Sequence, residues 1–191
     1  MGFINVDLLL IADYVFVVIV FLALWAALRR VNESLMAIAL ILLFISAATY
    51  FASTVAFEML SLSSQYMAAS TDAQMSIILA AGHAMLAIWQ GTAFDISYIL
   101  AAFATLIVSA VMLRSHLSGR TTAYAGIMAS LLMFVPASAG TIGLVFSLLS
   151  LVPYAVWLAL PARRAPSISA EQIKRKARTE LKGMGITANI V

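Results

Sequence analysis

Cysteine is missing from this 191-residue chain, and charged side chains are scarce. Without cysteine the chain has no disulfide, no thiolate nucleophile and no cysteine-ligated metal centre. Asp, Glu, Lys and Arg make up 10% of the residues, whereas hydrophobic residues make up 64%. That apolar share is far above the value for a soluble domain. We therefore expect an all-α fold, a polytopic membrane helix bundle.

Catalytic motifs are also missing. The sequence has no P-loop, no glycine-rich dinucleotide motif, no HExxH metal motif and no GxSxG nucleophile motif. Its two histidines, His83 and His116, fall in segments that we expect on opposite sides of the membrane, so a shared metal ion is not expected. We predict no catalytic residue, no metal and no cofactor.

Long apolar runs dominate what is present. The first, at residues 8–28, contains Asp13 as its only charged side chain and is followed by Arg29 and Arg30. Because Asp7 precedes this run and the basic pair comes after it, we interpret it as a membrane span rather than a cleaved signal peptide. A second run is expected to form an unbroken helix at residues 35–57, with Asn32 or Ser34 as its N-cap.

The segment Asp72–Arg114 decides the number of spans. It is about twice the length of a single crossing, since roughly 20 helical residues span the hydrocarbon core. Two crossings would place nine of the eleven basic residues on the opposite side from Arg29 and Arg30. One crossing places all eleven on the cytoplasmic side, where Lys and Arg concentrate. We predict the plasma membrane, an outside N-terminus, a cytoplasmic C-terminus and five transmembrane helices, at residues 8–28, 35–57, 92–113, 122–136 and 141–160.

Residues 58–91 are expected to form an extended helical hairpin on the outer face. Thr71 and Gln74 stand at the positions of a capping box, in which the Thr hydroxyl accepts an amide proton and Gln reaches back to the cap, so a helix begins there. The hairpin is rich in apolar residues that need cover, including Met85 and Trp89. We expect it to be a lid over the bundle or a docking face for a partner protein or a second copy.

Carboxylates without a cationic neighbour are the ligand or ion candidates. Asp13, Glu58 and Asp95 are expected near one level toward the outer face, where they would bind a cation, a proton or an amine. The alternative is that these carboxylates are hydrated at the membrane interface or hydrogen-bonded to hydroxyl groups. His83 joins the candidates because it belongs to a polar repeat at seven-residue spacing. The repeat comprises Ser76, His83, Gln90 and Ser97.

Residues 162–191 form a basic cytoplasmic tail with seven basic and two acidic residues. A capping box at Ser169 to Gln172 predicts a short tail helix. The tail can bind anionic inner-leaflet lipids or remain solvated. It lacks aromatic side chains that would stack on bases, so nucleic acid is not an expected partner. The lipid-facing candidates are Lys174, Arg175, Lys176 and Arg178.

Three stretches, at residues 28–37, 60–70 and 113–127, resemble a bacterial membrane family catalogued as domain of unknown function 4386 (DUF4386). The resemblance covers about residues 13–164. It implies a membrane helix bundle and brings no activity with it. It also implies one further N-terminal span in most members, which we expect this chain to lack.

Three function classes follow. The absence of catalytic motifs favours a small subunit or scaffold that packs against partner proteins or lipids. The alternative is a small carrier or ligand-binding membrane protein that uses the outer carboxylates. An intramembrane enzyme would need Glu58, His83 and Asp95 as acid–base groups, but the sequence offers no nucleophile or complete metal set.

Overall fold

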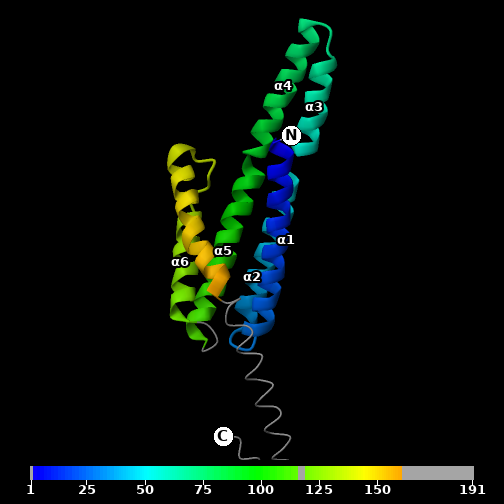
Figure 1. Cartoon of the computed structure of the whole chain (residues 1–191). Coiled ribbons are helices and arrows are strands. Elements are labelled where there is room, and N and C mark those ends of the chain that lie inside the picture. Colours follow the sequence, from blue (N-terminus) through cyan, green and yellow to red (C-terminus); the bar gives the residue numbers. More distant parts are fainter. Residues whose placement is uncertain (1, 116–118, 161–191) are drawn as a thin grey trace, which may run out of the picture.

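The computed structural model describes residues 2–115 and 119–160, which form an all-α bundle (Figure 1). The side chains of residues 2–7 are not described. The labelled helices are α1 (Gly2–Leu28), α2 (Glu33–Ser53), α3 (Ala56–Ala68), α4 (Asp72–Trp89), α5 (Thr92–Arg114) and α6 (Arg120–Met133). The last described helix, Gly140–Leu160, carries no label and is called the 140–160 helix.

Within the described residues, four helical segments are long and apolar enough to cross a membrane. They are Leu8–Leu28, Glu33–Ala68, Asp72–Arg114 and Gly140–Leu160. Helix α6, where the sequence predicts a further span, has 14 residues and is therefore about 21 Å long, which is shorter than a hydrocarbon core of roughly 30 Å. The protein is a polytopic membrane helix bundle, as predicted, with α6 as its short member.

Helices α4 and α5 follow one another in nearly the same direction (Figure 1). The segment Asp72–Arg114 therefore does not fold back on itself, which is the arrangement that a single crossing requires. Gln90 and Gly91 separate the two helices, and the amide of Gly91 donates to the carbonyl of Ile88 (3.0 Å).

Helices α3 and α4 pack against each other as a hairpin that projects beyond the rest of the bundle (Figure 1). The predicted capping box starts α4, since the amide of Gln74 donates to Thr71 Oγ1 (3.3 Å). The Gln74 side chain reaches back to the amide of Ser70 (3.3 Å), one residue before the cap. The capping box is therefore confirmed, with this shift of one residue.

Helix α2 is shorter than predicted, because it ends at Ser53 instead of running unbroken through Phe57. Thr54 has an extended backbone (φ −72°, ψ 131°), and its hydroxyl donates to the carbonyl of Phe51 (2.8 Å). In a continuous helix that carbonyl would accept the amide of Val55. A threonine side chain that satisfies a nearby carbonyl competes with the helix, which explains the break.

The core lies where α1, α2, α5, α6 and the 140–160 helix meet. Its largest fully buried side chains include Phe21, Leu28, Met36, Leu43, Met112 and Trp157. Gly126 of α6 packs so closely that a Cβ atom there would overlap Ser109 Oγ and the Trp157 ring. Small residues thus allow α5, α6 and the 140–160 helix to approach one another.

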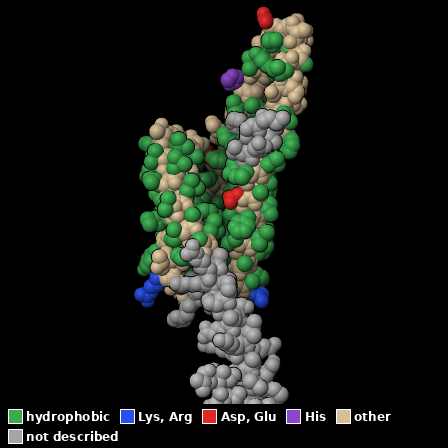
Figure 2. All heavy atoms as spheres, viewed as in Figure 1, with side chains coloured by type: hydrophobic (Ala, Val, Ile, Leu, Met, Phe, Trp, Pro, Cys, Tyr) green, Lys and Arg blue, Asp and Glu red, His purple; other side chains and the backbone are tan. Residues whose placement is uncertain are grey.

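Basic side chains gather at the end of the bundle opposite the hairpin (Figure 2). In the described part of the chain they are Arg29, Arg30, Arg114 and Arg120. Asp72 begins α4 at the far tip of the hairpin. The molecule is therefore electrically asymmetric along its long axis.

Candidate binding sites at the helical hairpin

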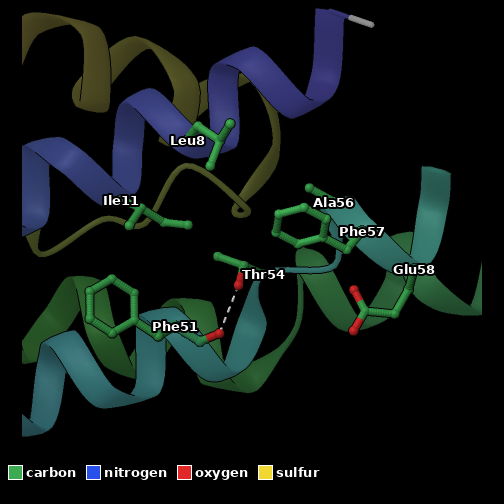
Figure 3. Close-up of a pocket in the computed structure, with 7 residues that line it drawn as sticks. All are labelled: Leu8, Ile11, Phe51, Thr54, Ala56, Phe57 and Glu58. Carbon is green, nitrogen blue, oxygen red and sulfur yellow. Dashed lines mark hydrogen bonds between the residues drawn. The ribbon is translucent and has the colours of Figure 1, made fainter. Parts of the chain in front are cut away.

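A small pocket lies where α1 meets the break between α2 and α3 (Figure 3). Its volume is about 200 Å³. Three helices build it, because α1 supplies two aliphatic side chains, the end of α2 supplies a ring and a hydroxyl, and the first turn of α3 supplies a ring and a carboxylate. The lining residues are Leu8, Ile11, Phe51, Thr54, Ala56, Phe57 and Glu58.

Glu58 is the only charged residue in this lining. It stands in the first turn of α3, where the helix dipole favours a negative charge. Among the described residues, no base forms an ion pair with it. The Thr54 hydroxyl donates its proton to the Phe51 carbonyl, so toward a ligand it offers only an acceptor oxygen. The pocket therefore presents hydrogen-bond acceptors within an apolar wall.

A second and larger hollow of about 370 Å³ runs between α3 and α4. Gly82 borders open space in it, since a Cβ atom at this position would have no atom within 4 Å. Its walls are mainly apolar, with two hydroxyl groups and one imidazole. The lining residues are Met59, Leu62, Ser63, Tyr66, Ile78, Leu79, Gly82, His83 and Leu86. We call this hollow the hairpin groove.

The hairpin leaves much of its apolar surface uncovered. No residue of α4 is buried, and Ala56 is the only buried residue of α3. Met67 is 83% exposed, Ile77 69% and Phe57 65%. Exposed apolar side chains of this number are typical of a contact with another protein or a membrane.

The four predicted ligand or ion candidates lie in separate surroundings. Glu58 lines the pocket and exposed His83 lines the hairpin groove. Asp95 is half-buried and accepts a hydrogen bond from Ser138. In the described segments, no three His, Asp or Glu side chains are arranged to hold a metal ion.

Asp13 is exposed on α1. It does not line the pocket that holds Glu58. The structure therefore separates Asp13 from Glu58.

The residues of the predicted polar repeat do not share one solvent-exposed helix face. His83 is exposed, whereas Ser97 is buried and its carbonyl accepts the Ser46 hydroxyl (2.7 Å). Met85 and Trp89, the predicted partner-facing residues, are half-buried. The tail candidates Lys174, Arg175, Lys176 and Arg178 lie outside the described residues, as does the predicted tail helix.

Sequence reasoning missed a set of hydrogen bonds inside the bundle. The hydroxyls of Tyr14 and Ser46 lie 3.4 Å apart, which links α1 to α2. Tyr98 and Ser147 join α5 to the 140–160 helix (2.8 Å). Ser and Tyr residues within otherwise apolar spans were the available signal, because a buried hydroxyl needs a partner. Which hydroxyls pair depends on helix rotation and could not be inferred from spacing.

Comparison with known proteins places the chain in a family. The family model described as Domain of unknown function (DUF4386) matches residues 5–164, a range that includes both the pocket and the hairpin groove. No curated protein and no solved structure matches the chain.

Proposed function

Since the chain belongs to the DUF4386 family, whose description assigns no activity, we propose its role from its surfaces: a non-catalytic membrane subunit or scaffold whose hairpin groove binds a partner protein. The observation that carries this proposal is the uncovered apolar hairpin. Neither of its helices buries a substantial face against the described part of the chain.

The dimensions of the helices support a protein partner over lipid. Helix α2 has 21 residues and α5 has 23, which correspond to about 31 and 34 Å. Both lengths suffice to cross a hydrocarbon core of roughly 30 Å. Helix α4 continues beyond α5 for another 18 residues, about 27 Å. The hairpin would therefore stand clear of the acyl chains.

Charge supports a different protein over a second copy. The hairpin, from Ala56 to Trp89, contains Glu58 and Asp72 but no Lys or Arg. A second copy of the hairpin would bring the same acidic groups and no counter-charge. We propose that the occupant is a partner helix with an apolar ridge and at least one Lys or Arg, which the acidic hairpin complements.

We also propose an orientation of the protein in the membrane. The arginines at one end of the bundle favour that end in the cytoplasm of a plasma membrane, because basic loops are retained inside. The N-terminus and the hairpin would then be outside and the C-terminus inside. The basic tail would face the anionic inner leaflet.

Photo-crosslinking in native membranes tests the partner. A photoreactive residue at Leu79, in the groove, should yield a protein adduct whose crosslinked segment is an apolar helix containing Lys or Arg. The same residue at Ile142, which is 69% exposed on the 140–160 helix, is the control and should yield lipid adducts.

Charge reversal tests whether the Leu79 adduct depends on charge complementarity between the hairpin and its partner. Asp72→Lys should lower the yield of the Leu79 adduct several-fold, and an acidic substitution at the partner's basic residue should restore it. A homodimer adduct, or lipid adducts alone at both positions, would contradict the proposed partner.

A further inference from the structure

We propose that the pocket at the α2–α3 break binds a small organic ammonium ion, with Glu58 as its counter-charge and Phe57 as the aromatic wall beside it. This site is distinct from the hairpin groove, because the two share no lining residue. Ammonium binding in this pocket requires no partner in the hairpin groove.

The charge and hydrogen-bonding character of the lining select the ligand class. The described lining offers one carboxylate and one acceptor hydroxyl oxygen, and no lining side chain provides a donor free of another partner. An anion would be repelled. A neutral apolar molecule would gain nothing from the exposed carboxylate. A ligand with a positive charge and N–H donors satisfies both acceptors.

A metal ion fits this lining less well than an ammonium ion. Ca²⁺ takes six to eight oxygen ligands, and Mg²⁺ keeps several waters beside its one or two carboxylates, so either ion would have to hold its remaining water ligands against an apolar wall. The described residues contain no group of three acidic or histidine side chains arranged for a metal. One carboxylate with apolar neighbours is instead the arrangement that pairs with a single ammonium group.

The apolar part of the lining determines the remainder of the ligand. The Phe57 ring and the Glu58 carboxylate extend from adjacent residues of α3, whereas the Phe51 ring lies toward the other end of the pocket, beyond Thr54 (Figure 3). Cations are attracted to the faces of aromatic rings, and short alkyl groups pack on aliphatic side chains such as Leu8 and Ile11. A cavity of about 200 Å³ is smaller than a drug-binding pocket of roughly 300 Å³ or more, so the ligand has few heavy atoms.

A ligand can reach the pocket without movement of any helix. Phe57 is 65% exposed and Glu58 is also exposed, so the carboxylate can be reached from the surface of the described chain. Such a site would sense or concentrate amines at the membrane surface without any chemical step.

Binding of n-butylammonium and of 1-butanol, which have the same number of heavy atoms, tests the proposal on purified full-length protein in detergent. The ammonium ion should bind at least tenfold more tightly than the alcohol, measured by ligand-observed NMR. Glu58→Gln should remove this preference, whereas Glu58→Asp should keep it. Glu33→Gln is the matched control, because it makes the same substitution in the first turn of α2, outside the pocket.

Two results would overturn the proposal. One is equal binding of the ammonium ion and the alcohol by the unmodified protein. The other is an ammonium preference that Glu58→Gln leaves intact. Phe57→Leu provides a second variant, since it keeps the charge, removes the ring and should weaken ammonium binding more than alcohol binding.

Discussion

Gly126 shows how much a single residue can contribute to this bundle. It lies between Ser109 of α5 and Trp157 of the 140–160 helix, and both neighbours are fully buried. The Ser109 hydroxyl and the Trp157 indole N–H have no hydrogen-bond partner within the described structure. Close van der Waals packing must therefore offset the cost of burying these polar groups. Any side chain at position 126 removes that packing.

Gly126→Ala is expected to destabilise the protein by about 1–3 kcal/mol, because the added methyl group overfills a packed junction. Thermal or denaturant unfolding in detergent measures the change. Gly82→Ala is the matched control, since nothing lies within 4 Å of a Cβ atom there, and alanine is favoured over glycine within a helix by about 1 kcal/mol. It should leave stability unchanged or raise it. An equal loss in both variants would contradict the packing argument.

Single side chains also determine where the helices begin and end. The amide of Leu35 donates to Asn32 Oδ1 (3.0 Å), so Asn32 is the N-cap of α2. The sequence left Asn32 and Ser34 as alternatives, and the structure selects the former. At the other end, Thr54 separates α2 from α3 and so creates one wall of the Glu58 pocket.

Asn32→Ala should cost about 1 kcal/mol of stability, because the capping acceptor of α2 is lost. The loss should also appear as faster amide exchange in the first turn of α2 in a hydrogen-exchange experiment. Ser34→Ala is the control, since Ser34 is exposed and lies within the helix instead of at its cap. Matching losses from the two substitutions would show that the cap contributes nothing.

Helix length and the position of the basic residues determine the polarity of the whole molecule. Helices of about bilayer thickness end near four arginines, while the apolar hairpin extends at the opposite end (Figures 1 and 2). The same polarity places the Glu58 pocket and the hairpin groove away from the basic end. Both proposed sites would then face the outside of the cell.

Single cysteines test this orientation cleanly, because the native chain has none. Ser70→Cys, at the exposed tip of the hairpin, should react with a membrane-impermeant maleimide in intact cells. Glu33→Cys, exposed beside the first arginine pair, should react only after permeabilisation. The reverse pattern would place the basic end outside and would contradict the positive-inside argument.

Four features could be predicted from the amino-acid sequence alone. They are the membrane class, the all-α fold, the helix cap at Thr71 in the hairpin, and the location of the arginines at one end of the bundle. They follow from hydrophobicity, local hydrogen bonding and charge, which act between neighbours along the chain. The break at Thr54, the pocket that joins α1 to Glu58, and the junction at Gly126 required the folded structure. Each depends on which faces of distant helices meet, and helix rotation is set by packing between segments that the spacing of residues does not specify.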